Sequence, residues 1–129
     1  MSDRQTIVSA DAPAPIGPYA QAIAAGGFVF CSGQVGMDPA AGTLIGDDVA
    51  AQTKQAMANL GAVLHAAGLT FGDVVKTTIF LIDMNDFTVV NGIYADAFGE
   101  GAVPARSTIA VAGLPRGARV EIEAIALMS

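Results

Sequence analysis

The sequence predicts an α+β fold in which two helices cover one face of a six-stranded β-sheet. Three observations predict this fold. Strand-like and helix-like patterns follow one another in the order β-β-β-α-β-α-β-β. The length of 129 residues suits one domain, so we expect a single domain over residues 1–129. An apolar fraction of 53% with only 14% charged residues excludes an intrinsically disordered chain.

Six segments have the composition of β-strands. Most are rich in β-branched and aromatic residues, and glycine or proline lies close to their ends. The pair Gly26-Gly27 predicts the turn of a β-hairpin. Residues 11–18 hold three prolines and should form a stiff, extended loop. The predicted strands comprise residues 5–9, 19–25, 28–32, 74–82, 106–112 and 119–127.

Two segments place apolar residues at the 3.6-residue period of an amphipathic helix. Gly68 followed by Leu69 predicts a left-handed cap at the end of the first helix, and Gly99 should end the second. The apolar face of the second helix contains Phe87, Val90, Tyr94 and Phe98. The predicted helices run from a cap at Asp47 or Asp48 to residue 67, and from a cap at Asn85 or Asp86 to residue 98.

The composition indicates that part of the surface is buried between copies of the chain. Two helices are too few to cover both faces of a six-stranded sheet. In addition, 14% of the residues are charged, against about 25% in ordinary soluble domains. Self-association explains both observations, so we expect an oligomer.

Charge and cysteine usage disfavour several classes of partner. The formal net charge of −6 argues against nucleic acid and anionic membrane surfaces, because both need a concentrated positive patch. No apolar run reaches 18 residues and no apolar leader is visible, so neither a membrane span nor a secretory signal is expected. The single cysteine, Cys31, excludes an internal disulfide and favours a cytoplasmic location. With one cysteine and one histidine, a zinc or iron cluster is not expected, while a carboxylate-only Mg²⁺ site stays open.

Arg106 is the strongest candidate for a binding residue. It stands at the entry of an otherwise uncharged strand, two residues after Pro104. A guanidinium beside an apolar strand needs an anionic partner, and its planar arrangement of paired N–H donors suits a carboxylate. A structural ion pair or a strand end in water is the alternative interpretation.

Glu121 and Glu123 alternate with apolar neighbours and therefore point to the same side of the last strand. Ile125 and Leu127 follow on that side, which places the carboxylates at the margin of an apolar surface. Such carboxylates suit a general acid or base, or a group that orients water. A half-exposed strand with its polar face in water gives the same pattern, and the pattern alone favours this second interpretation.

Four further positions could contribute to a site. Tyr19 closes the proline loop and could offer its hydroxyl, although its ring could equally belong to the core. At Ser32-Gly33 the chain leaves a strand at a glycine, where the main chain can approach a ligand closely. Asn91 lies on the apolar side of the second helix, and its amide needs a loop backbone, which is favoured, or a ligand. Cys31 is interpreted as a core residue.

Taken together, these residues resemble the RidA (YjgF-type) family of imine/enamine deaminases. The resemblance covers nearly the whole chain, in order and with similar spacing. Each segment is moderately specific, and seven in register are a strong signal. They are residues 14–22 (APIGPYAQA), 31–34 (CSGQ), 50–52 (AAQ), 75–78 (VKTT), 86–87 (DF) with 90–91 (VN), 104–107 (PARS) and 120–126 (VEIEAIA).

The resemblance implies a chorismate-mutase-like (YjgF-type) α+β fold with a mixed sheet, assembled as a homotrimer with its sites at subunit interfaces. It also implies hydrolysis of reactive 2-enamine and 2-imine acids, of the 2-aminoacrylate type, to 2-oxo acids and ammonia. This activity would protect pyridoxal-phosphate enzymes and would use neither a cofactor nor a metal.

By the same resemblance, Arg106 grips the substrate carboxylate and Glu121 positions or activates water. Many members carry Cys where this chain has Thr108, and we expect that position to contribute through its backbone. The resemblance also places Tyr19, Ser32 and Asn91 along the cleft and the main chain of Gly33 beside it.

Two other functions remain open. A non-catalytic trimer that binds a small carboxylate would keep Arg106 but would not need Glu121. A chaperone-like interaction module would use the apolar surface and would not need Arg106. A nuclease is disfavoured by the net charge of −6.

Overall fold

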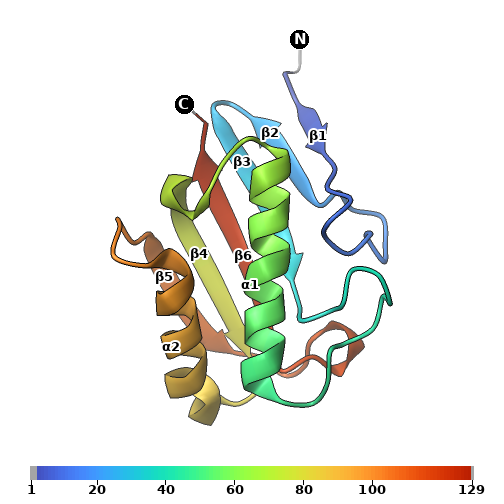
Figure 1. The fold of residues 1–129 in the computed structure, drawn as a ribbon, viewed down its shortest axis with the longest axis vertical. Coiled ribbons are helices and arrows are strands. Elements are labelled where there is room, and N and C mark those ends of the chain that lie inside the picture. The colour runs from blue at the N-terminus through green and yellow to red at the C-terminus, as the bar shows by residue number, and fades with distance from the viewer. Residues whose placement is uncertain (1–2, 129) are drawn as a thin grey trace.

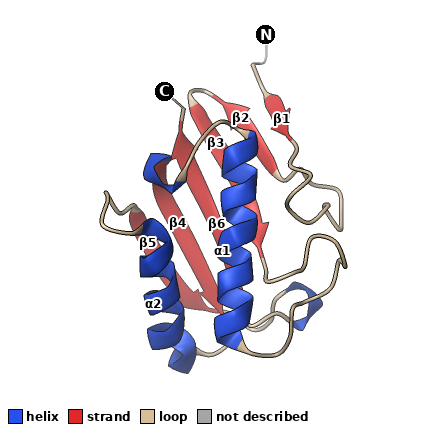
Figure 2. Ribbon diagram, viewed as in Figure 1, coloured by secondary structure: helices blue, strands red, loops and turns tan. Residues whose placement is uncertain are grey.

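Residues 3–128, which the computed structural model describes, form a six-stranded sheet with two helices on one face (Figures 1 and 2). The strand order is β1-β2-β3-β6-β4-β5. Neighbouring strands are antiparallel, except that β4 and β5 are parallel and are connected through α2. The elements are β1 (Gln5–Ile7), β2 (Ala22–Ala25), β3 (Phe28–Gln34), α1 (Val49–Ala66), β4 (Val74–Leu81), α2 (Phe87–Phe98), β5 (Ala105–Ala110) and β6 (Val120–Leu127). The predicted α+β fold with a mixed sheet is confirmed.

Both ends of α1 are held as the sequence predicts. At its start, Asp48 Oδ2 accepts a hydrogen bond of 3.0 Å from the N–H of Ala51, so Asp48 rather than Asp47 is the cap. At its end, Gly68 has a φ of +78°, and the N–H of Leu69 donates to the carbonyl of Leu64 at 2.9 Å. This arrangement is the predicted left-handed cap.

The start of α2 differs from the prediction. A 3-10 turn (Met84–Asp86) precedes the helix, and Asp83 caps this turn by accepting from the N–H of Asn85 at 2.9 Å. Asp86 stands directly before Phe87, but its carboxylate caps nothing. Both of its oxygens accept instead from Arg119 Nη2, at 3.1 and 2.9 Å. Asp86 is therefore the N-cap residue, one of the two positions predicted to open the helix, but it makes no side-chain cap because its carboxylate is held in an ion pair.

The predicted strand over residues 19–25 was wrong over its first three residues. Gln21 is buried, and its side-chain oxygen accepts from the N–H of Ser9 at 2.7 Å. Its amide nitrogen donates to the carbonyls of Ser9 and Pro13, at 3.1 and 2.9 Å. These bonds fold the chain before β2 back along the proline loop, so pairing with β3 begins only at Ala22.

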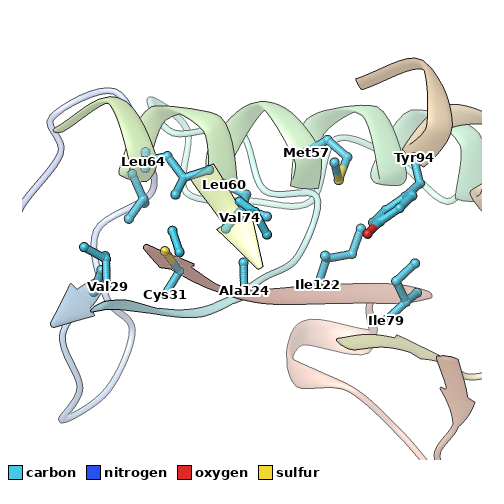
Figure 3. Close-up of a cluster of buried hydrophobic side chains, with 14 of the residues drawn as sticks. Val29, Cys31, Met57, Leu60, Leu64, Val74, Ile79, Tyr94, Ile122 and Ala124 are labelled. Atoms are coloured by element: carbon cyan, nitrogen blue, oxygen red, sulfur yellow. The ribbon is translucent and has the colours of Figure 1, made fainter. Parts of the chain in front are cut away.

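The apolar core lies between the two helices and the sheet (Figure 3). Each helix contributes one stripe of side chains, and each central strand contributes every second residue. The core includes Leu60 and Leu64 of α1, Tyr94 of α2, and Val29, Cys31, Ile79, Ile122 and Ala124 of the sheet. Cys31 is thus the core residue that the sequence indicated.

The other sheet face carries no helix, and we call it the open face. Phe30 and Leu127 on this face are 46% and 48% exposed. None of the helices within residues 3–128 is long and apolar enough to cross a membrane. Alternation along the strands and the register assign to the open face Phe28 and Phe30 of β3, Thr78 and Phe80 of β4, Ser107 and Ile109 of β5, and Glu121, Glu123, Ile125 and Leu127 of β6.

Candidate active site

Arg106 lies on the helix-covered face of the edge strand β5, next to Thr77 of β4. Its guanidinium carbon is 4.9 Å from the ring centroid of Tyr94 and 5.6 Å from that of Phe87. No carboxylate oxygen of residues 3–128 lies within 4.0 Å of its nitrogens, since the ion pair in this part of the chain is Arg119–Asp86. The structural ion pair considered from the sequence is therefore wrong, and the guanidinium fork is free to bind an anion.

A small cavity of about 220 Å³ adjoins Arg106, and we call it the arginine pocket. Asn91 lines this pocket and makes no side-chain hydrogen bond within residues 3–128, so the interpretation that it holds a loop backbone was wrong. Thr108 is two residues from Arg106 on the same face of β5, and its buried Oγ1 has no hydrogen-bond partner in the described part of the chain. The pocket is lined by Asn91, Tyr94, Phe98, Val103, Pro104 and Arg106, among others.

Glu121 lies on the open face beside a larger cavity of about 350 Å³, which we call the glutamate pocket. Its carboxyl is about half buried, and burial, followed by repulsion from Glu123, raises its pKa above the ordinary value of 4.5. A carboxyl with a raised pKa can exchange a proton with water more readily near neutral pH. The pocket is lined by Tyr19, Ser32, Gly33, Gln34, Pro115 and Glu121, among others.

Gly33 allows the Glu121 carboxylate to lie against the main chain of β3. A Cβ atom at residue 33 would be 2.5 Å from Oε2 of Glu121 and 2.7 Å from its Cδ. Contacts this short do not occur, so a side chain at residue 33 would displace the carboxylate. The sequence analysis expected the main chain at Gly33 to approach a ligand; the structure shows it approaching the Glu121 side chain instead, at a glycine inside β3.

The proline loop forms one wall of the glutamate pocket. Tyr19 is half exposed at this wall, and its hydroxyl accepts a hydrogen bond of 3.3 Å from the N–H of Ile16. Ser32 Oγ donates to the carbonyl of Ala20 at 2.6 Å, which leaves the Ser32 oxygen able only to accept from a ligand. Tyr19 thus belongs to the pocket and not to the core.

Residues that sequence reasoning missed shape the opposite wall. Asn59 is buried in α1, and its amide nitrogen donates to the carbonyls of Val35 and Met37, at 3.2 and 2.9 Å. Val35 and Met37 line the glutamate pocket. The buried face of α1 also contains Gln52 and Thr53, and such polar residues at core positions of a helix were the signal that could have indicated an anchored loop.

The seven predicted site residues fall into two groups on opposite faces of the sheet. Arg106 pairs with Thr77, whose side chain points toward the helices, whereas Glu121 pairs with Phe80 on the open face. Within one chain the structure therefore does not bring Arg106 and Glu121 together. Arg106, Asn91 and Thr108 form the first group, and Tyr19, Ser32, Gly33 and Glu121 form the second. Within residues 3–128, no group of three or more histidine, cysteine or acidic residues is arranged to hold a metal ion.

A family model described as "Endoribonuclease L-PSP" matches residues 9–128. The 2-iminobutanoate/2-iminopropanoate deaminase of Mus musculus is 53% identical over 124 residues, which cover 96% of this chain and 91% of the mouse protein. The chain belongs to the YjgF/RidA family. The resemblance stated from the sequence is thereby confirmed.

Solved structures of this RidA family have the same fold as the chain described here. The E. coli YjgF gene product superposes with a TM-score of 0.92 at 46% identity, covering 97% of this chain and 99% of that one. E. coli TdcF, solved with bound serine, superposes with a TM-score of 0.92 at 40% identity and with the same coverage. The YjgF-type fold predicted from the sequence is therefore confirmed.

Proposed function

We propose that this RidA-family protein hydrolyses 2-imino acids, formed from 2-aminoacrylate-type enamines, to 2-oxo acids and ammonia. Relatives from mouse, human and Salmonella typhimurium that are 53%, 49% and 47% identical bear the name 2-iminobutanoate/2-iminopropanoate deaminase. The observation that carries the proposal is the complementary chemistry of the two pockets. One presents an arginine without a carboxylate partner, and the other presents a carboxyl of raised pKa.

Each group has a defined part in the reaction. The fork of Arg106 binds the substrate carboxylate through two parallel hydrogen bonds and fixes the plane of the C=N group. Glu121 accepts a proton from water as the water oxygen bonds to the imine carbon. It then donates that proton to the imine nitrogen. Glu121 then takes the hydroxyl proton of this adduct and passes it to the amino nitrogen, so the C–N bond breaks and ammonia leaves as the C=O bond forms. An imine carbon is already electrophilic, so the enzyme needs to lower the activation barrier by only a few kcal/mol. Each tenfold increase in rate corresponds to about 1.4 kcal/mol.

The proposal requires that the site form between copies of the chain, because Arg106 and Glu121 lie on opposite faces of one sheet. The open face supplies an apolar contact surface that includes Phe30, Ile109 and Leu127. Burying exposed apolar side chains of this kind is the main driving force for association. We propose a homotrimer with three sites, each taking Arg106 from one subunit and Glu121 from its neighbour.

Mixing two inactive variants tests both the reaction and the shared site. The assay measures ammonia or 2-oxo acid released from enzymatically generated 2-aminoacrylate. Arg106→Ala and Glu121→Gln should each be inactive alone. After mixed assembly at equal amounts, about one quarter of the sites should combine a native Arg106 with a native Glu121 and recover activity.

Each outcome of the mixing experiment decides one part of the proposal. Wild-type protein without a rate above background would overturn the deaminase assignment. A Glu121→Gln variant as active as the wild-type protein would overturn the role proposed for Glu121 while leaving the deaminase assignment in place. Mixed assemblies, verified by native mass spectrometry, that recover no activity would overturn the shared site.

We further propose that the substrate is a small molecule and that neither nucleic acid nor a membrane is a partner. The described lining of the glutamate pocket includes Glu121 and Glu123 and no lysine, arginine or histidine. An RNA phosphate would be repelled there, and the net charge of −6 adds to the repulsion. A cytoplasmic location is also proposed, because the single cysteine, Cys31, is buried and forms no disulfide within the described residues.

A further inference from the structure

We propose that Phe87 and Tyr94 form an aromatic clamp that positions the guanidinium of Arg106 for binding the substrate carboxylate, with Thr77 fixing the clamp. The proposal rests on the function proposed above and assigns to these three residues a positioning role. Phe87 and Tyr94 belong to α2, Thr77 belongs to β4 and Arg106 belongs to β5.

The first argument is that Arg106 needs a restraint that leaves its donors free. An arginine side chain has many rotamers, and binding a ligand with a mobile side chain loses that freedom at the moment of binding. A carboxylate partner would restrain the side chain but would occupy the donors that the substrate needs. The rings of Tyr94 and Phe87, at 4.9 and 5.6 Å, restrain the cation without accepting conventional hydrogen bonds.

The second argument is that the Tyr94 ring of the clamp is held in place, whereas Phe87 is 38% exposed. Phe87 and Tyr94 are seven residues apart, two turns of α2, and therefore lie on one side of the helix. Tyr94 is only 5% exposed and points its hydroxyl from α2 toward the sheet (Figure 3). The ring of Phe98 packs against that of Tyr94 at a centroid distance of 4.7 Å.

The third argument is the location of the anchor. The hydroxyl groups of Tyr94 and Thr77 form a hydrogen bond of 2.6 Å, and Thr77 is fully buried. Thr77 is also the residue opposite Arg106 in the β4–β5 pairing. The ring is thus fixed to the strand position beside the arginine it contacts, so helix and strand cannot shift relative to each other without moving the clamp.

Three variants test the clamp through the split between KM and kcat. Phe87→Leu removes one ring, Tyr94→Leu removes the other, and Tyr94→Phe keeps the ring but removes the bond to Thr77. We expect each leucine variant to raise KM about fivefold to tenfold, with a smaller change in kcat, because the lost contact acts on carboxylate binding. Phe87→Tyr, which keeps a ring at that position, should restore the wild-type KM.

The matched control is Phe71→Leu. Phe71 belongs to the same aromatic cluster, since its ring lies 5.2 Å from that of Phe98, but it neither contacts Arg106 nor lines the arginine pocket. This variant removes a partly buried aromatic ring that packs against the same core cluster. We expect it to lower thermal stability while KM stays at the wild-type value.

A second measurement does not depend on catalysis. The Nε–Hε signal of Arg106 in an NMR spectrum should carry a ring-current shift that Phe87→Leu and Tyr94→Leu reduce and Phe71→Leu preserves. The affinity for pyruvate, measured by calorimetry, should likewise fall in Phe87→Leu and Tyr94→Leu and stay unchanged in Phe71→Leu. An unchanged Arg106 signal and pyruvate affinity in both leucine variants would overturn the clamp, even in an active enzyme. If both leucine variants lose the ring-current shift and the pyruvate affinity while the wild-type protein has no deaminase activity, the clamp is supported and only the proposed reaction is overturned.

Discussion

Replacing Gly33 by alanine tests whether the Glu121 carboxylate must rest against the main chain of β3. The new Cβ would lie 2.5 Å from Oε2 of Glu121, and ordinary contact begins at 3.4 Å, so the carboxylate must retreat by about 0.9 Å. A displacement of about 1 Å in a catalytic group lowers the rate about 100-fold. Gly33 does not have a positive φ, so the backbone accepts alanine, and the half-exposed Glu121 side chain can rotate away. We therefore expect kcat/KM to fall about 100-fold while the free energy of unfolding changes by less than about 1 kcal/mol.

The assay is steady-state release of 2-oxo acid by Gly33→Ala, together with a urea titration. Gly101→Ala is the control, because an added Cβ there meets no atom within 4 Å and Gly101 has no positive φ. It should match the wild-type protein in both measurements. If Gly33→Ala keeps kcat/KM within about threefold of wild type while Glu121→Gln is inactive, the carboxylate does not work from this position.

Three further predictions concern pH, reactivity and stability. Because the pKa of Glu121 is raised in the folded chain, folding retains its proton, and the free energy of unfolding should decrease as pH rises above 4.5. Urea titrations across this range should show the decrease, and Glu121→Gln should abolish it. Burial raises the pKa of the Cys31 thiol to about 11, so a thiol reagent at pH 8 should label it only after unfolding, and rapid labelling of native protein would contradict its burial. Gln52 accepts from the N–H of Arg119 at 2.8 Å and donates to the carbonyl of Gly46 at 2.7 Å, so Gln52→Leu should cost about 1–3 kcal/mol in urea unfolding.

Local chemistry made much of the fold predictable. The capping carboxylate of Asp48 and the left-handed Gly68 act within a few residues of their own position, so sequence alone identifies them. Predictions failed where a distant partner decides the local structure. Ser9, 12 residues away, holds Gln21 out of β2.

The structure places each predicted site residue beside one of two pockets or on its sheet face, but this arrangement could not be predicted from the sequence. Arg106 and Glu121 stood out as charged residues beside apolar strands. Their separation onto two faces depends on β4 pairing with β6 on one side and with β5 on the other, which no local pattern encodes. Tyr94 and Phe87 were assigned only to an apolar helix face, because nothing in their spacing shows that a cation from β5 lies over them.

Under the proposed shared site, the placement of Arg106 and Glu121 on opposite faces has a thermodynamic consequence. A centre completed by a neighbour exists only while the neighbours stay bound, so turnover per subunit becomes a function of total protein concentration. Mass action then ties the fraction of working centres to the dissociation constant of the assembly. Dilution would abolish activity by dissociating the subunits, without unfolding any of them. A substitution on the open face that weakens subunit association would abolish activity in the same way, even far from any reacting atom.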